Sequence, residues 1–182
     1  MLLENNINNL NSSVIDFVLK GTDGKLYSLA DFDDKDILVI IFMCNHCPYV
    51  IAVIKRFIEL QKVFTDKKVQ FIGINPNDTA AYPEDSFENM VIFHKENKMN
   101  FPYLIDETQE TARKYDAVCT PDIYVYNKER ILKYRGRLDD NWKDENNVTK
   151  HELEDAIKKI INGGEPVEDM KPSMGCSIKW YK

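Results

Sequence analysis

The stretch that decides the fold is ILVIIFMCNHCPYV, residues 37–50. Its first seven residues are all apolar and mostly β-branched, which is typical of a strand buried on both faces of a largely parallel sheet. From Val50 onward, apolar side chains recur every three or four residues, which predicts an amphipathic helix. Pro48 falls in the first turn of that helix, where its missing N–H costs little. We therefore expect Cys44 and Cys47 at the junction between a buried strand and a helix.

A helix start is a favourable place for a thiolate, because unpaired N–H groups and the positive end of the helix dipole point there. In C-x-x-C settings the cysteine pKa falls from about 8.5 to roughly 3.5–7.5. Two intervening residues also allow Cys44 and Cys47 to close a small disulfide ring that is easily reduced. His46, if protonated, would favour the thiolate and make the couple more oxidising. The motif thus favours thiol redox chemistry.

Three other interpretations of the two cysteines compete with this one. A structural zinc site needs four ligands, and the remaining candidates are single and scattered along the chain: Cys119, Cys176, His94 and His151. A haem attachment motif would have a histidine where Pro48 stands. Inert core cysteines explain one thiol better than two at such a junction. We expect no metal and no cofactor.

Size and charge narrow the class of protein. A chain of 182 residues with 43% hydrophobic content suits one globular domain with a full core. The net charge of −6 and the absence of a basic stripe argue against nucleic acid as a partner. The first residues suggest no signal peptide, and no run has the length of a membrane span. The expected location is the cytoplasm, where a C-x-x-C is more often catalytic than structural.

The expected elements follow the order hairpin, β-α-β, helix, short strand, helix, hairpin, helix. Residues 1–13 are rich in Asn and predict a flexible leader. The predicted strands cover residues 14–19, 25–27, 37–43, 69–75, 101–105, 123–126 and 131–135. The predicted helices start at Pro48, after Pro83, at Asp106 as N-cap, and at a Thr149–Glu152 capping box, the last ending at Gly163–Gly164. Residues 14–162 form the predicted domain, and residues 163–182 a C-terminal tail.

This order and the Cys44–Cys47 motif together resemble the thioredoxin fold in its peroxiredoxin-like variants, the alkyl hydroperoxide reductase/thiol-specific antioxidant (AhpC/TSA) type. The tail segment around Cys176, Gly175 to Trp180, is similar to members with a thioredoxin-type C-x-x-C. The resemblance implies an α/β fold, with a central mixed β-sheet flanked by helices, an N-terminal hairpin extension and a C-terminal tail. It covers nearly all of residues 14–162.

The resemblance also implies a cis-proline loop opposite the C-x-x-C. Thr120–Pro121 occupies that place, and an X-Pro bond is the one peptide bond for which the cis form costs little free energy. The proline would expose a backbone edge for docking a substrate chain. Cys119, two residues earlier, would lie near the thiols or be a packed core cysteine. Cys176 in the tail would be a mobile resolving thiol or a passive one.

Two departures from the family patterns bear on mechanism. Cys47-Pro48 fits the peroxidatic Cys-Pro of peroxiredoxins. That family also needs an arginine to stabilise the peroxide transition state, and its position falls on or beside Pro121, where no arginine stands. Arg113, Arg135 and Arg137 are the alternatives. Relative to thioredoxin, Met43 replaces a tryptophan and the strand before the motif contains no carboxylate. Asp78, Glu84, Asp85 and His46 are the unranked candidates for a proton acceptor.

Three functions remain open on these grounds. The leading one is a thiol-disulfide oxidoreductase that cycles a Cys44–Cys47 disulfide, with Cys44, expected to be the more exposed thiol, as attacker. The second is a thiol-dependent hydroperoxide reductase with Cys47 as the peroxidatic cysteine. The third is a thioredoxin-fold chaperone for a soft metal. The implied substrate is a protein disulfide or a small hydroperoxide, and the implied electron donor is a thioredoxin-like protein or a small thiol.

Overall fold

Strand β4 (Ile37–Phe42) forms the centre of the molecule, and each of its six residues is at most 3% exposed. The computed structural model describes residues 2–5, 9–164 and 169–182. β4 pairs in parallel with β5 (Val69–Asn75) and antiparallel with β8 (Asp122–Tyr126). Its apolar side chains suit this place because both of its faces are covered. The expected central strand is confirmed.

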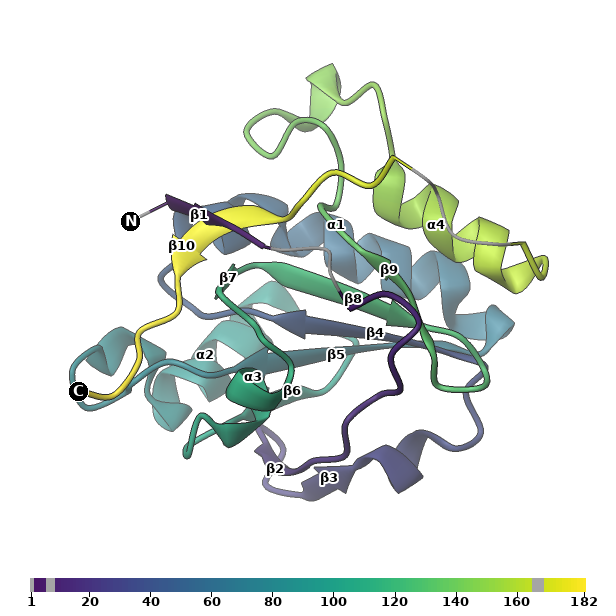
Figure 1. The fold of residues 1–182 in the computed structure, drawn as a ribbon. Coiled ribbons are helices and arrows are strands. Elements are labelled where there is room, and N and C mark those ends of the chain that lie inside the picture. Colours follow the sequence, from purple (N-terminus) through teal and green to yellow (C-terminus); the bar gives the residue numbers. More distant parts are fainter. Residues whose placement is uncertain (1, 6–8, 165–168) are drawn as a thin grey trace.

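The main sheet is mixed and twisted (Figure 1). Within the described residues it has seven strands, in the order β3 (Leu26–Ser28), β2 (Val18–Gly21), β6 (Tyr103–Ile105), β5, β4, β8 and β9 (Leu132–Arg135). β4, β5 and β6 run parallel, while the outer strands on each side pair antiparallel. The expected central mixed sheet and the closing hairpin are confirmed.

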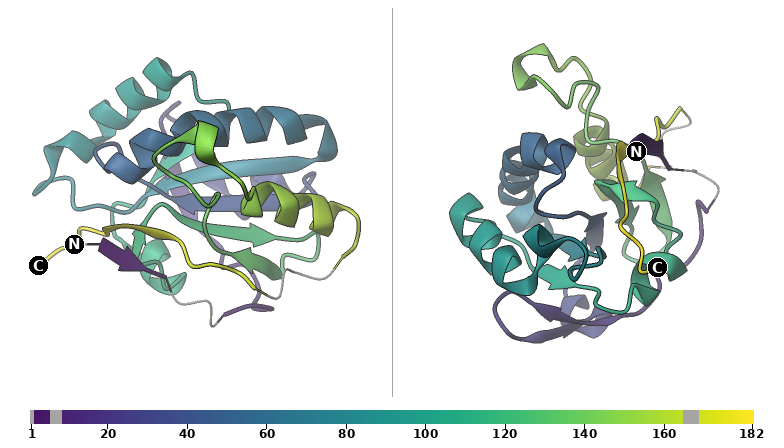
Figure 2. Two further views of the ribbon diagram at one scale, coloured as in Figure 1. Left: turned by 90° about the horizontal axis from the view of Figure 1, so that it is seen from above. Right: turned by 90° about the vertical axis from the view of Figure 1, so that its left-hand side faces the viewer.

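Helices cover both faces of this sheet (Figure 2). Alternate residues Ile37, Val39 and Ile41 face a core shared with α1 (Pro48–Phe64), α2 (Phe87–Asn97) and α4 (Glu152–Ile161). The intervening residues of β4 face a second core that includes α3 (Glu110–Lys114). Short 3-10 helices lie at Leu29–Phe32, Thr65–Lys67, Pro83–Asp85 and Glu145–Asn147. None of the helices in the described ranges has the length and apolar character needed to cross a membrane.

A second, small sheet joins the two ends of the chain. It has the order β1 (Leu2–Glu4), β10 (Met174–Ser177) and β7 (Cys119–Thr120), and both pairings are antiparallel. Figure 1 shows the purple N-terminal strand beside the yellow C-terminal one. The leader expected to be flexible therefore contains a paired strand, and the tail contains another. Residues 1, 6–8 and 165–168 of these two segments lie outside the described residues.

Three local predictions about where elements begin were displaced. The first hairpin strand begins at Val18, since Val14 instead donates its N–H to Arg130 (2.8 Å). Helix α3 starts after Gln109, whose φ of 62° interrupts the helix expected from Asp106. The Thr149 N–H and hydroxyl bind Asp140 (2.9 and 2.5 Å), so α4 begins at Glu152 without the expected capping box. The domain boundaries at 13/14 and 162/163 stay predictions.

Candidate active site

The two cysteines lie at the junction between β4 and α1. Cys47 is the N-cap of α1, and Pro48 is its first residue, as expected. The carbonyl of Cys47 accepts the N–H of Ile51 (2.9 Å), which closes the first helical turn. Cys44, expected to be the more exposed thiol, is 1% exposed and Cys47 is 0% exposed, so both sulfurs are buried because other segments cover this junction. Both thiols are free.

The pKa values of Cys44 and Cys47 are shifted in opposite directions. The thiol of Cys44 donates a hydrogen bond to Cys47, which raises the pKa of Cys44, and burial raises it further. The same hydrogen bond is the largest cause that lowers the pKa of Cys47, to about 4, against the opposing effect of burial. The hydroxyl of Thr120 and the N–H groups of Val50 and Cys176 also stabilise the Cys47 thiolate. The reduced site therefore holds its negative charge on Cys47.

The Thr120–Pro121 loop faces both sulfurs. Its peptide bond is cis, as expected. The hydroxyl of Thr120 lies 3.5 Å from Cys44 Sγ, and its carbonyl oxygen lies 3.0 Å from Cys47 Sγ. That carbonyl accepts the S–H of Cys47 whenever Cys47 is protonated and so favours the thiol. Four donors oppose this one acceptor, and for that reason the thiolate on Cys47 is favoured.

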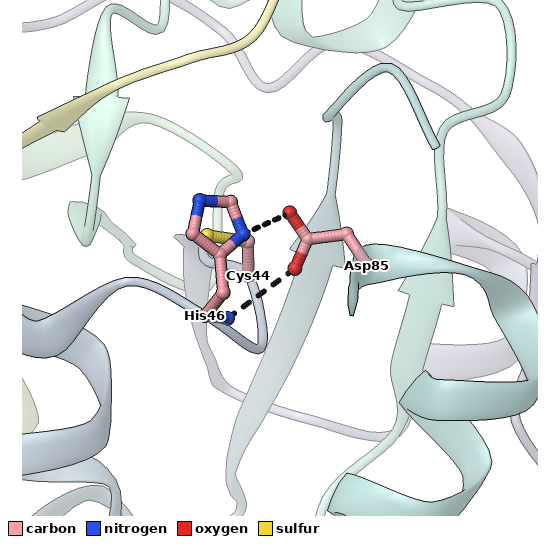
Figure 3. A group of neighbouring side chains, drawn as sticks. All are labelled: Cys44, His46 and Asp85. Atoms are coloured by element: carbon pink, nitrogen blue, oxygen red, sulfur yellow. Dashed lines mark hydrogen bonds and ion pairs between the residues drawn. The ribbon is translucent and has the colours of Figure 1, made fainter. Parts of the chain in front are cut away.

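Asp85 is the carboxylate of the site. It lies in a short 3-10 helix, is fully buried, and its Oδ2 is 2.7 Å from Nδ1 of His46 (Figure 3). Its Oδ1 accepts the N–H groups of Asn45 (2.8 Å) and His46 (3.4 Å), and Oδ2 also accepts from Asn77 (2.7 Å). The negative charge of Asp85 contributes to the raised pKa of Cys44. Asp85 therefore contacts His46, and a polar atom of each of these side chains lies within 4.8 Å of Cys44 Sγ.

The structure ranks the four candidate proton acceptors. Asp85 and His46 contact the motif, and the His46 ring stacks on Tyr82 with centroids 5.8 Å apart. The carboxylate of Asp78 accepts the N–H groups of Ala80 and Ala81 (3.0 and 3.1 Å), so it closes a turn. Glu84 contributes its backbone carbonyl to Asn45 (2.9 Å). Of the four candidates, Asp85 and His46 are the two whose side chains the structure pairs at the motif.

Cys44, His46 and Asp85 form the one group of this kind in the described part of the chain whose ligand atoms could hold a metal ion, within 4.8 Å of one another. Both oxygens of Asp85 already accept N–H donors, and the thiol of Cys44 already donates to Cys47. Carboxylate is also a poor ligand for a soft ion. These contacts are those of a hydrogen-bonded network, and the geometry adds no support to soft-metal delivery.

Three arginines were candidates to stabilise a peroxide. Nη2 of Arg135 lies 3.1 Å from Asp122, and Arg137 is paired with Glu152 (2.6 Å). Arg113 lies over the ring of Trp180, 4.3 Å from its centroid. All three guanidinium groups have partners other than the two thiols.

The structure separates the two accessory cysteines. Cys119 is buried, and its thiol donates to the carbonyls of Pro121 (3.6 Å) and Ser173 (3.8 Å). Burial raises its pKa, which suits a packed core thiol. Cys176 is half-buried, and burial followed by a hydrogen bond to Cys47 raises its pKa to about 11. Of the two, Cys176 is the one that packs against the core cluster containing Cys44 and Cys47.

Sequence reasoning missed Asn77 and the N–H of Cys176 as contributors to the site. Asn77 follows β5. Because β5 runs parallel to β4, the carboxyl end of β5 lies at the same edge of the sheet as the thiols. That topology was a usable signal for Asn77. The N–H of Cys176 comes from a strand whose position no local pattern indicates.

Known proteins with similar sequences show which family the chain belongs to. The AhpC/TSA family matches residues 10–135. The chain belongs to the AhpC/TSA family. As a member it is an oxidoreductase with thiol-based redox activity, on a thioredoxin-like fold. No curated protein gives a significant match.

Solved structures show how far the similarity extends. An uncharacterized conserved protein from Geobacillus kaustophilus is 41% identical over 100% of this chain and 97% of its own, with a TM-score of 0.93. A hypothetical protein from Sinorhizobium meliloti 1021 is 34% identical over 98% of this chain and 97% of its own, with a TM-score of 0.92. Peroxidoxin BcpB from Mycobacterium tuberculosis shares the fold at 17% identity, over 85% of this chain and 94% of its own (TM-score 0.60).

Proposed function

We propose that this AhpC/TSA member is a thiol-disulfide oxidoreductase that cycles a disulfide between Cys44 and Cys47. The observation that carries the proposal is that both sulfurs face one residue, Thr120, at the start of α1, with Cys44 Sγ 3.5 Å from its hydroxyl and Cys47 Sγ 3.0 Å from its carbonyl oxygen. The lowered pKa of Cys47 and the raised pKa of Cys44 then give a thiolate for attack beside a thiol that can close the ring. Pro48 starts the helix that supports this charge, and Thr120–Pro121 brings both groups of Thr120 to the sulfurs.

The distribution of charge makes Cys47 the attacking thiolate in this proposal. Cys47 attacks one sulfur of a substrate disulfide, the substrate S–S bond breaks, and a mixed disulfide forms on Cys47. Cys44 then loses its proton and attacks Cys47, which releases the second substrate sulfur as a thiol. His46, paired with Asp85, is close enough to the motif to accept and return that proton. Two electrons pass to the substrate and the protein keeps a Cys44–Cys47 disulfide.

A hydroperoxide reductase is the second candidate, and one observation favours it. The thiolate lies on Cys47, the residue that matches the peroxidatic Cys-Pro position. Against it, Arg113, Arg135 and Arg137 are all engaged elsewhere. In either case we propose that the protein acts in the cytoplasm and binds neither a membrane nor nucleic acid. Its substrate would be a protein disulfide or a small hydroperoxide, and its electron donor a thioredoxin-like protein or a small thiol.

Trapping with single-cysteine variants tests the proposal. Cys44→Ser and Cys47→Ser proteins are mixed with an aromatic disulfide reagent or with hydrogen peroxide, and adducts are located by mass spectrometry. We expect a stable mixed disulfide on Cys47 in Cys44→Ser and a much slower reaction in Cys47→Ser. A Cys119→Ser variant controls for loss of a buried thiol.

The two candidates then give different products. Rapid sulfenic acid formation on Cys47, with steady consumption of reductant under peroxide alone, would favour the hydroperoxide reductase. If neither reagent modifies Cys47 in the folded protein, both candidates fail.

A further inference from the structure

The C-terminal strand β10 occupies the backbone edge beside the reactive thiols. It pairs antiparallel with β7, with Cys176 opposite Thr120 and Ser177 opposite Cys119. Thr120 is the residue whose hydroxyl and carbonyl touch both sulfurs. A strand added to this edge would place one side chain in every two near the thiols. In this chain the strand is its own tail, and the side chain is Cys176.

Gly175 shows how closely this strand approaches. A Cβ at Gly175 would overlap the carbonyl oxygen of Thr120, and it would lie 2.6 Å from the Thr120 carbonyl carbon and 3.1 Å from the nitrogen of Pro121. These atoms are backbone and cannot move aside as a side chain would. Only glycine permits this approach, so the position of β10 depends on residue 175.

β10 is held at both of its ends. On one side, Asn5 and Ser173 exchange two hydrogen bonds (3.0 and 3.1 Å), and β1 pairs along the outer edge of β10. On the other side, the N–H of Lys179 binds Asn77 (2.9 Å), and its carbonyl accepts the N–H of Asp78 (2.8 Å). The strand is therefore a built part of the site.

Cys176 packs against the core cluster that contains Cys44 and Cys47. Burial raises the pKa of Cys176 to about 11, and a hydrogen bond to Cys47 contributes to the rise. Cys176 is half-buried, whereas the other two are at most 1% exposed. An external thiol therefore meets Cys176 first.

We propose that β10 is a built-in substrate strand, which places Cys176 to exchange with the Cys44–Cys47 disulfide and closes the docking edge to extended peptides. This inference rests on the proposed Cys44–Cys47 cycle and adds a third thiol to it. Its ligand class is a small thiol or small disulfide, since a peptide strand would have to displace β10 to reach the thiols.

The exchange balances without an added oxidant. Cys176 loses its proton and attacks Cys47; the Cys44–Cys47 bond breaks, the Cys47–Cys176 bond forms, and Cys44 leaves as a thiolate that takes up the proton. An external small thiol then attacks Cys176, and Cys47 leaves as the stabilised thiolate. A second small thiol then attacks the mixed disulfide on Cys176. The two small thiols leave as one disulfide, Cys176 returns to the thiol form, and the two external thiols have supplied the two electrons that the protein disulfide takes up.

Disulfide mapping tests the exchange. Full-length protein is oxidised with one equivalent of diamide, quenched in acid, alkylated and mapped by mass spectrometry. We expect Cys44–Cys47 together with a detectable Cys47–Cys176 fraction in the wild type, and Cys47–Cys176 as the main product in Cys44→Ser. Cys119 should stay reduced in both and is the internal control. Folded Cys44→Ser protein that leaves Cys176 fully reduced would overturn the inference.

Two variants of β10 separate the thiol from the strand. Cys176→Ser should keep the Cys44–Cys47 disulfide but lose about tenfold or more in its rate of reduction by a small thiol. Gly175→Val should displace β10, lower Cys47–Cys176 formation, and increase the rate with a peptide disulfide. Ser177→Ala in the same strand is the matched control and should resemble the wild type. A Cys176→Ser protein reduced as fast as the wild type would contradict the exchange role.

The outcomes also separate this inference from the function beneath it. If the wild type forms Cys44–Cys47 and turns over but never forms Cys47–Cys176, the oxidoreductase stands and the role of Cys176 fails. If Cys44–Cys47 itself never forms, the proposed function fails first.

Discussion

Asp85 and Asp122 are two fully buried carboxylates, one paired beside the C-x-x-C motif and the other beside the cis-proline loop, and they have different partners. Asp122 follows Pro121 and is paired with Arg135, which is only 1% exposed. Asp85 is paired with His46, whose side chain is 28% exposed. An arginine keeps its charge at any ordinary pH, whereas a histidine can gain or lose a proton near neutrality.

The two pairs differ in what their side chains hold together. Arg135 also donates to the carbonyl of Asp116 (2.7 Å) and lies over the Tyr124 ring, so it joins the cis-proline loop to the surrounding core. Burial raises the pKa of Asp122, and the charge of Arg135 opposes this. Asp85 joins a network that reaches solvent through His46 and ends at Cys44. We expect the first pair to govern stability and the second to govern reactivity.

The largest expected effect is on the Asp122–Arg135 pair. Arg135→Met would leave the Asp122 carboxylate buried without its partner, and we expect the free energy of unfolding to fall by about 3–5 kcal/mol. Urea unfolding followed by circular dichroism measures this. Arg113→Met, at an exposed position over Trp180, should cost less than about 1 kcal/mol. Equal losses in the two variants would remove the assigned structural role.

The next effect tests the Asp85–His46 pair. Asp85→Asn keeps the size of the side chain but removes the charge that orients His46, and we expect thiol-disulfide exchange to slow by about 10- to 100-fold. Stopped-flow exchange kinetics measure the rate, and thermal unfolding checks the fold. Glu84→Gln is the matched control, because Glu84 is the neighbouring acid and only its backbone carbonyl accepts a hydrogen bond from Asn45. An unchanged rate in Asp85→Asn would exclude Asp85 from the chemistry.

A titration sharpens the same comparison. The Cys47 thiolate should persist from neutral pH down to about 4, where its ultraviolet absorbance disappears, while Cys44 stays protonated above the ordinary thiol range. Since the folded pKa of Cys47 lies below its unfolded value, its contribution to stability grows as pH rises above about 4 and is lost as pH falls through that value. Asp85→Asn should lower the pKa of Cys44, because the negative charge of Asp85 is one cause of its rise.

The smallest expected effect concerns the stacking of Tyr82 on His46. Tyr82 is 37% exposed, and its ring is nearly parallel to the imidazole, with an interplanar angle of 5°. Tyr82→Leu should change stability by less than about 0.5 kcal/mol and the exchange rate by less than about twofold. A larger change in rate, measured by the same kinetics, would mean that the stack positions His46 and does more than cover it.

Local patterns predicted the core of the fold well. The apolar run of β4, the helix from Pro48 and the closing hairpin are confirmed, because each depends on a periodicity that its own residues carry. The starts of α3 and α4 were misplaced, since Gln109 and Asp140 intervene through backbone geometry and distant hydrogen bonds. The site was half predicted: Cys44, Cys47, His46 and Pro121 come together, but the choice of Asp85 among the nearby acids required the tertiary structure.

The sequence alone determined that two cysteines stand at the start of a helix, because the buried strand, Pro48 and the helical periodicity lie within a few residues of them. Only the tertiary structure decided which thiol carries the charge, which carboxylate faces the site, and that the C-terminal strand covers the pair. These features depend on contacts between residues 40 to 130 positions apart in the chain, such as Asn45 with Asp85 and Cys47 with Cys176. The spacing of side chains along one segment does not indicate contacts between segments so far apart in the chain.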